Sequence, residues 1–311
     1  MDVFPGFNVT WLRENARMKE ERYRHYRMKF EQYPVYNIVE HMPPHLDLEL
    51  TARCQLKCPG CPSMKLDYEK GDMPYDVALS AVHEFGSMGG MAVKFNWRGE
   101  PTLYKRLYEI IAAAKKVGLM DRMINTNGIA IDTTMSYRLI ESGLSTIIFS
   151  IDSTKYDVYK KLRVGATLDK ALRGLRSFCE IAEGTDVLIR VQRIEYPNAH
   201  QESHKAFVEF FEEKFPRVNA VASNKYKEKS MKGCDSPSNP CAQLWQRILI
   251  AYDGTVGACC EMNRLEPLGK FPENDLFEIW RGARLEALRN AHWQGEQNGI
   301  EGCRKCMVTK V

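Results

Sequence analysis

The chain has 311 residues, of which 44% are hydrophobic, a size that allows one large α/β domain with a small appendage. Its 44 Lys and Arg and 40 Asp and Glu leave a formal charge of +4, too small to indicate nucleic-acid binding. No apolar run is long enough to span a membrane, and the first residues lack the layout of a secretory signal. Because ten cysteines without an export signal favour metal binding over disulfides, we expect a cytoplasmic, oxygen-sensitive protein.

Residues 1–44 are predicted to form an N-terminal helical extension. The segment 8–33 is polar, basic and aromatic with one apolar stripe, which is typical of a helix that packs on a larger domain. Pro34, Pro43 and Pro44 are expected to end this helix before the first strand begins.

Three cysteines follow the first predicted strand. Cys54, Cys58 and Cys61 have C-x3-C-x2-C spacing, and three thiolates on one short loop can hold three irons of a [4Fe–4S] cube. The fourth iron then has no protein ligand and can bind an amine and a carboxylate, as S-adenosylmethionine (SAM) offers them. A zinc site is the alternative, although structural zinc prefers four protein ligands.

Strands and helices alternate from residue 45 to residue 223, as a parallel βα architecture requires. Strands are predicted at 45–51, 91–97, 121–126, 145–151, 186–193 and 218–223. Helices are predicted at 75–86, 103–117, 132–142, 168–182 and 201–214. Because these strands are fewer than the eight of a closed barrel, the predicted fold class is α/β, with a partial (β/α)6 TIM-like barrel over 45–223.

Polar residues and glycines stand on or after successive predicted strands: Gly99, Glu100, Asn127, Ser150, Asp152, Arg190 and Gln192. A carboxylate can accept hydrogen bonds from an ammonium group, and a hydroxyl with a carboxylate suits a ribose diol. Each signal is weak alone. Because parallel strands of a barrel end at one rim, we expect these residues to build one site there.

The rest of the chain is predicted to form a polar linker, residues 224–240, and a small cysteine-rich domain, residues 241–311. Asp253-Gly254 between β-prone residues predicts a hairpin over 248–256. Four thiolates, Cys241, Cys259, Cys303 and Cys306, are enough to hold a second cube or to complete a zinc site. Cys234 in the linker could replace Cys241 as a ligand.

Across residues 45–223 the chain resembles the radical SAM enzymes. The cluster loop 54–61, Gly99-Glu100-Pro101, Thr126-Asn127-Gly128 and Ser150-x-Asp152 fall in that family's order and approximate spacing. The C-terminal layout resembles the Twitch extension, a shortened SPASM domain, and implies one auxiliary [4Fe–4S] cluster rather than zinc.

This resemblance also implies roles for the rim residues. Gly99 and Glu100 would meet the methionine amine of SAM, and Ser150 and Asp152 its ribose or carboxylate. Arg190 or Gln192 would meet the remaining polar groups.

The chain departs from the family pattern at one position. The residue before the last cluster cysteine, often an aromatic near the adenine, is Gly60 in this sequence. Adenine stacking would therefore have to come from elsewhere in the chain.

Cys260 directly follows Cys259, and a thiol can give a hydrogen atom to a carbon radical. It could equally be a packing cysteine, or a ligand in place of Cys259. The resemblance implies cleavage of SAM to a 5′-deoxyadenosyl radical and hydrogen abstraction from an unactivated C–H bond.

We expect epimerisation of a sugar, an aminoglycoside-like compound or another small metabolite, with Cys260 as hydrogen donor. The alternatives are a dehydrogenase that uses the auxiliary cluster and a peptide-modifying epimerase. A non-catalytic zinc-binding protein is the alternative outside this class. The expected partners are the substrate and an external electron donor such as flavodoxin or ferredoxin, with no nucleic acid or membrane.

Overall fold

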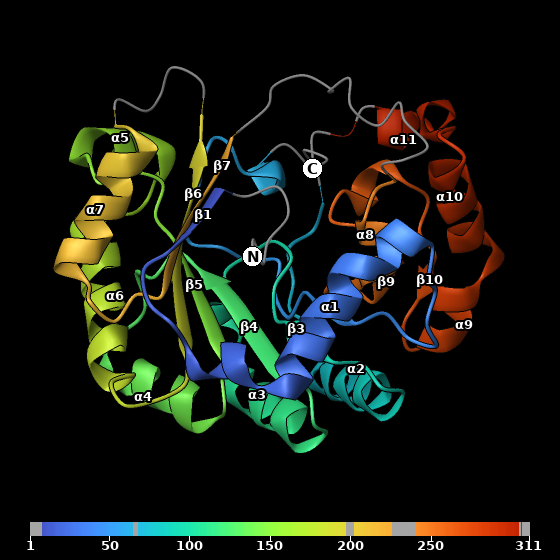
Figure 1. Ribbon diagram of the computed structural model, residues 1–311, viewed down its shortest axis with the longest axis horizontal. Helices are drawn as coiled ribbons and strands as arrows, with labels where there is room; N and C mark the ends of the chain where they lie inside the picture. The colour runs from blue at the N-terminus through green and yellow to red at the C-terminus, as the bar shows by residue number, and fades with distance from the viewer. Residues whose placement is uncertain (1–7, 65–67, 197–201, 226–239, 305, 307–311) are drawn as a thin grey trace.

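The computed structural model describes residues 8–64, 68–196, 202–225, 240–304 and 306. One ten-stranded sheet, in the order β1-β7-β6-β5-β4-β3-β2-β8-β9-β10, runs through the molecule (Figure 1). Its strands are β1 (Asn8–Trp11), β2 (His45–Leu48), β3 (Ala92–Lys94), β4 (Asp121–Thr126), β5 (Thr146–Ser150), β6 (Leu188–Glu195), β7 (Ala220–Lys225), β8 (Arg247–Ile250), β9 (Thr255–Gly257) and β10 (Gly269–Lys270).

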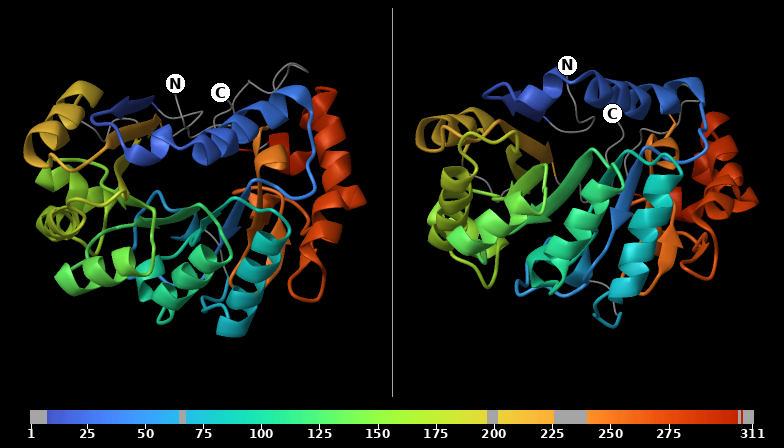
Figure 2. Two further views of the ribbon diagram at one scale, coloured as in Figure 1. Left: turned by 60° about the horizontal axis from the view of Figure 1, so that its bottom comes forward. Right: turned by 90° about the horizontal axis from the view of Figure 1, so that it is seen from below.

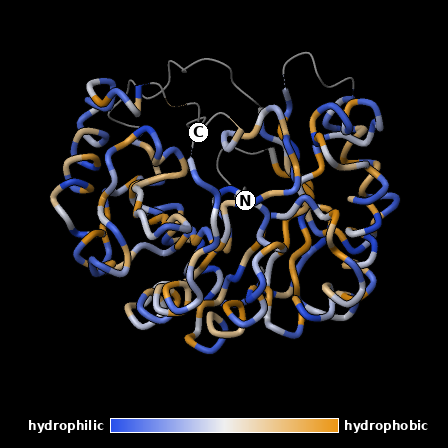
Figure 3. The backbone as a smooth tube through the Cα atoms, turned by 180° about the vertical axis from the view of Figure 1, so that it is seen from behind, coloured by the Kyte–Doolittle hydropathy of each residue, from blue (hydrophilic) through white to orange (hydrophobic). Residues whose placement is uncertain are grey.

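The six strands β2 to β7 are parallel and adjacent in chain order, which confirms the predicted α/β partial barrel. The helices of the barrel are α2 (Tyr75–Ser87), α3 (Leu107–Lys116), α4 (Thr133–Glu141), α5 (Tyr156–Leu162), α6 (Leu168–Ile181) and α7 (His204–Lys214). Of these, α5 was not expected. Leu46 and Leu48 point from β2 into the main core, whereas His45 and Asp47 point to the opposite, inner face. Figure 3 shows the apolar residues gathered along these strands.

The sheet continues from the barrel into the C-terminal region. Strand β8 pairs in parallel with β2, and the predicted hairpin is present as the antiparallel pair β8–β9. This region of the described chain also contains the helices α8 (Gln243–Gln246), α9 (Leu276–Arg281), α10 (Ala283–Trp293) and α11 (Glu301–Arg304). Because β7 runs to Lys225, the predicted linker starts later than residue 224, and most of it, with Cys234, lies outside the described residues.

The N-terminal prediction was wrong in two respects. The segment 8–33 is not one helix, because β1 pairs with β7 before helix α1 (Glu21–Tyr36) begins. Pro34 does not end α1 but lies inside it, at a position where proline removes the hydrogen bond to the carbonyl four residues earlier. That carbonyl, on Phe30, accepts a hydrogen bond of 2.7 Å from Gln246 Nε2 instead. The helix ends at Asn37, which has a left-handed backbone with φ of 52°.

Helix α1 crosses the open inner face of the sheet, on the side opposite to α2, α3 and α4 (Figure 2). Its aromatic residues Tyr23, Tyr26 and Phe30 pack against Ala92 and Met123, near the amino ends of the strands. The interior is therefore closed at the amino ends of the strands, which leaves the carboxyl ends for the active site.

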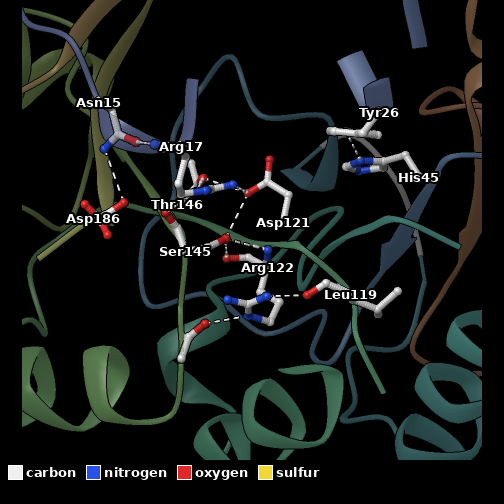
Figure 4. A network of polar contacts seen from close by, with 11 residues as sticks. Asn15, Arg17, Tyr26, His45, Leu119, Asp121, Arg122, Ser145, Thr146 and Asp186 are labelled. Carbon is white, nitrogen blue, oxygen red and sulfur yellow. Dashed lines mark hydrogen bonds and ion pairs between the residues drawn. The ribbon is translucent and has the colours of Figure 1, made fainter. Parts of the chain in front are cut away.

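A buried polar network fixes the segment before α1 (Figure 4). Arg17 donates to Asp121 Oδ1 at 2.8 Å and to Thr146 Oγ1 at 3.0 Å. Burial alone would raise the pKa of Asp121, but the Arg17 guanidinium and neighbouring hydroxyls lower it below the usual value.

Candidate active site

The loop after β2 carries Cys54, Cys58 and Cys61 at the carboxyl end of the parallel strands. The Cys61 N–H donates to the Cys58 carbonyl at 3.0 Å. Partial burial, with the nearby charges of Glu100 and the other two cysteines, raises the pKa of the Cys54 thiol to about 11. Three thiols on one short loop fit an iron–sulfur cluster, whose binding replaces their protons.

The loop is held on one side by Gly99, whose φ is +64°. A Cβ atom at this position would lie 2.1 Å from the Thr51 carbonyl oxygen, so only glycine allows the approach. The next N–H, of Glu100, donates to the Arg53 carbonyl at 2.8 Å. The predicted role of Gly99 at SAM stays a prediction, and the contact that the structure shows is with the cluster loop.

The turn between α5 and α6 holds the other side of the loop. The Lys57 N–H donates to the Val164 carbonyl at 2.8 Å. A Cβ on Gly165, whose φ is +100°, would lie 3.2 Å from the Gln55 carbonyl oxygen. The sequence offered no sign of this contact, because it joins residues about a hundred positions apart.

Glu100 joins the ends of β3 and β4. Its carboxylate is buried and accepts hydrogen bonds of 2.8 Å from Thr102 Oγ1, Thr126 Oγ1 and the Asn127 N–H. Burial raises the pKa of Glu100 even though these donors oppose the rise. The Asn127 Nδ2 atom is buried without a partner among the described residues, so an acceptor from a bound molecule would satisfy it.

Asp152 is already paired. Its Oδ2 accepts from Arg163 Nε at 2.6 Å, and its Oδ1 accepts from the Ile194 N–H at 2.9 Å. The Arg163 guanidinium is also close enough to Cys58 to offset in part the rise in the Cys58 pKa that burial causes. Sequence reasoning missed Arg163, which links the predicted SAM contact to a predicted cluster ligand.

Ser150, Gln192 and Arg190 lie side by side on β5 and β6. Ser150 is the register partner of Gln192, and Gln192 Oε1 accepts from Arg190 Nη2 at 2.8 Å. Burial lowers the pKa of Arg190 to about 10. The structure thus brings these three predicted residues together on neighbouring strands.

An aromatic side chain lies beside the cluster loop after all. The Tyr196 phenol, which follows β6, covers Gly60, and a Cβ on Gly60 would lie 2.2 Å from the Tyr196 hydroxyl. The ring therefore stands next to Cys61 although it comes from a distant part of the chain.

His292 joins two members of the second cysteine set, Cys241 and Cys303. The Cys241 N–H donates to His292 Nδ1 at 3.3 Å, so Nε2 carries the ring proton and faces Cys303 Sγ at 3.4 Å. Burial lowers the pKa of His292 to about 4. Burial and the neighbouring thiols, Cys306 among them, raise the pKa of Cys241 to about 12 and hold the pKa of Cys259 well above its usual value.

Cys260 lies between this set and the barrel. Gln243 clamps it, because Gln243 Oε1 accepts the Cys260 N–H at 3.0 Å and Gln243 Nε2 donates to Cys260 Sγ at 3.3 Å. The Cys260 carbonyl accepts from Trp97 Nε1 at 2.7 Å, and Arg98 Nη2 donates to Asn263 at 2.6 Å. The end of β3 is thus bonded directly to the Cys260 turn. Burial raises the pKa of the Cys260 thiol to about 11, which keeps it protonated at neutral pH.

Two features are absent from the part of the chain that the structure describes. Within the described residues, no group of three or more Cys, His, Asp or Glu side chains is placed to hold a single metal ion. None of the described helices is long and apolar enough to cross a membrane.

Two family models match separate parts of the chain. Residues 48–189 match the radical SAM superfamily, and residues 241–307 match SPASM, an iron–sulfur cluster-binding domain. The chain carries a radical SAM domain followed by a SPASM domain. These domains imply a SAM-binding [4Fe–4S] cluster, auxiliary iron–sulfur clusters and SAM itself.

The individual relatives match different shares of this chain. The Fe-coproporphyrin III synthase of Methanosarcina barkeri is 34% identical over 142 residues, which is 45% of this chain but only 35% of that protein. The structure of BtrN with AdoMet and 2-DOIA superposes with a TM-score of 0.58 at 16% identity, over 86% of this chain and 94% of BtrN. Streptococcus suis SuiB bound to S-adenosylmethionine gives 0.64 at 14% identity, over 95% and 76%. Identities this low show only that BtrN and SuiB share the fold of this chain.

Proposed function

We propose that this chain is a radical SAM enzyme that acts on a small metabolite. Cys54, Cys58 and Cys61 would hold the SAM-binding cluster. Once reduced, that cluster supplies the electron that cleaves SAM to methionine and a 5′-deoxyadenosyl radical, which removes hydrogen from an unactivated C–H bond. The observation that carries the proposal is the cluster loop, held between two glycine contacts at the rim where the predicted polar residues meet.

The auxiliary cluster would be held by the second cysteine set. Its proposed ligands are Cys241, Cys259, Cys303 and Cys306, with His292 against Cys303 as a hydrogen-bond donor. Hydrogen bonds to cluster sulfurs are one of the ways in which a protein adjusts a reduction potential.

The rim residues divide the contacts to SAM among them. Glu100 has acceptor capacity left for the methionine ammonium, and Asn127 Nδ2 is a free donor within the described residues. Ser150 and Gln192 are half-buried and would meet hydroxyl or carboxylate groups. Asp152 would act through Arg163 rather than by direct contact, because its carboxylate is already paired. Tyr196 takes the place beside the cluster that an aromatic at position 60 would have had.

Epimerisation is the proposed reaction: the S–H bond of Cys260 would break as its hydrogen atom forms the new C–H bond on the opposite face of the substrate carbon. The resulting Cys260 thiyl radical would then take one electron from the proposed auxiliary cluster and one proton from solvent. Two observations support this role. Cys260 keeps its S–H at neutral pH, and Gln243 holds it as a residue apart from the proposed ligand Cys259. In the dehydrogenase alternative the substrate radical would instead lose a proton and an electron. The peptide-modifying epimerase would use the same thiol on a larger substrate.

The charges near Cys260 limit the kinds of substrate that could bind there. Asp47 is fully buried and is shared by two cations, Lys94 Nζ at 2.7 Å and Arg247 Nη1 at 3.0 Å. Arg247 is also close enough to Cys260 to oppose the rise in its thiol pKa. Because two cations share one carboxylate, this group of three side chains carries one net positive charge. It would repel a polycation, so we propose a neutral or anionic sugar or related metabolite.

Turnover in D2O tests the reaction. The epimerase should place solvent deuterium at the inverted carbon, and Cys260→Ala should still release 5′-deoxyadenosine from SAM without forming the epimer. Cys179→Ala, in the buried core, is the matched control and should retain epimerisation. A ketone product, or an epimer from Cys260→Ala, would rule the epimerase out.

A further inference from the structure

A basic surface lies directly outside the cluster loop. It consists of the exposed side chains of Lys57, Lys160, Lys161 and Val164, which we call the lysine surface. A depression of about 780 Å³ beside α5 is lined by Lys160, Lys161 and Val164, with Asp157 as its acidic member. Val164 is 42% exposed and gives the surface an apolar centre.

This surface is joined to the cluster loop by direct contacts. Lys57 precedes the proposed ligand Cys58, and its N–H donates to the Val164 carbonyl at 2.8 Å. The residue before Val164, Arg163, has its guanidinium close enough to Cys58 to lower the pKa of that thiol. An electron that enters at Val164 would therefore reach a cluster cysteine through one hydrogen-bonded turn.

We propose that the lysine surface is the docking site of a small acidic one-electron carrier protein. The inference rests on the proposed function, because only a redox cluster at Cys58 needs an electron from outside. Three lysines against one aspartate attract an acidic partner, and such charge complementarity mainly accelerates encounter. A small apolar centre with a charged surround also suits the limited interfaces of transient electron-transfer complexes.

The rest of the loop surroundings fits a carrier less well. The Arg53 guanidinium is neutralised by Asp72, to which it donates from Nε at 2.9 Å. The end of β3 is covered by the Cys260 turn, through the bond from Trp97. The turn at Val164 is thus where the loop, lysines without an ion pair among the described residues, and an exposed apolar side chain coincide.

Charge reversal tests the proposal with the intact chain. The test variant combines Lys57→Glu, Lys160→Glu and Lys161→Glu. The control combines Lys105→Glu, Lys116→Glu and Lys205→Glu, which changes the net charge equally on other exposed faces. Reduction of the reconstituted cluster by reduced flavodoxin is followed anaerobically by stopped flow, at low and high salt.

We expect the test variant to be reduced at least about tenfold more slowly at low salt, with its salt dependence lost. The control variant should behave like the native chain. Reduced methyl viologen, a small cation, should reduce all three proteins without a loss of rate.

Two results would overturn the docking site. One is an unchanged flavodoxin rate in the test variant, and the other is an equal loss in the control. Absence of iron, or failure of the native chain to be reduced by methyl viologen, would count against the proposed function instead. A test variant that loses turnover with methyl viologen but keeps its flavodoxin rate would place an acidic substrate, not a carrier, on this surface.

Discussion

Gly99 matters to the candidate site because it has no side chain. Its missing side chain lets the Thr51 carbonyl approach, and this contact positions the loop that carries the proposed cluster ligands. The sequence indicated that Gly99 belonged to the site, but it suggested a ligand contact because a glycine in a turn does not reveal what approaches it.

Gly99→Ala should therefore disturb the loop more than strain alone would. We expect a loss of about 3 kcal/mol in the free energy of unfolding and a lower iron content after anaerobic reconstitution. Gly89→Ala is the control, since φ at Gly89 is also positive, +91°, while nothing lies within 4 Å of an added Cβ. That variant should lose about 1 kcal/mol and keep its iron. Equal effects of the two variants would show that the approach of Thr51 is unimportant.

Other site residues had no local signal in the sequence. Cys54, Cys58 and Cys61 could be recognised because their spacing is short and bears directly on ligation. Arg163 and Tyr196 act on this loop from more than a hundred residues away, so only the folded chain reveals them.

At the scale of elements, α1 and α8 depend on each other. Gln246 of α8 supplies the donor that Pro34 denies to the Phe30 carbonyl. This explains why the expectation that Pro34 would end the helix failed: the compensating amide lies 212 positions further along the chain.

A double-mutant cycle can measure this dependence. Gln246→Leu alone should lower the free energy of unfolding by about 2 kcal/mol, because it leaves a buried carbonyl without a donor. In the Pro34→Ala background the restored N–H can bond to Phe30, so the same substitution should cost less. Chemical unfolding of the four proteins gives the coupling energy, and a coupling near zero would contradict this account.

The attachment of the segment before α1 predicts an acid sensitivity. The pKa of Asp121 in the native chain is below its usual 3.8, so the unfolded chain takes up the proton at a higher pH than the native one. The stabilisation by the Arg17–Asp121 pair is thus present above pH 3.8 and is lost as the pH falls through the lower native pKa.

Asp121→Asn should accordingly be about 3 kcal/mol less stable than the native chain at pH 7, since Arg17 is left buried beside an uncharged group. The difference in unfolding free energy between the two proteins should become smaller below pH 4. Unfolding free energies measured from pH 7 to pH 3 check this. Glu109→Gln, which removes an exposed pair with Arg106, is the control and should show no such convergence.

The alternation of strands and helices was sufficient to predict the barrel, because a two-residue and a 3.6-residue period are local properties of the chain. Pairing of β8 with β2 was not predictable in this way. It joins segments about two hundred residues apart, and a hairpin signal says nothing about which outer strand it will meet.

For the whole molecule, the two cysteine sets predict a definite metal content. Anaerobically reconstituted chain should be brown and contain about eight iron and eight sulfide per chain if each set holds one cube. A Cys54→Ala, Cys58→Ala, Cys61→Ala variant should keep about four of each and lose SAM binding. A colourless protein with zinc would favour the non-catalytic alternative.

The shared sheet has a consequence for dissecting this protein. A chain cut after residue 240 would remove β8 from β2. The backbone groups of His45–Leu48 that face β8 would then have no partners, although β2 would stay paired with β3 on its other side. Those four residues are fully or almost fully buried in the intact chain, so the cut would expose an unpaired sheet edge that can pair with other chains. We therefore expect the barrel alone to be recovered only as aggregates. The barrel and the C-terminal region should fold as one unit.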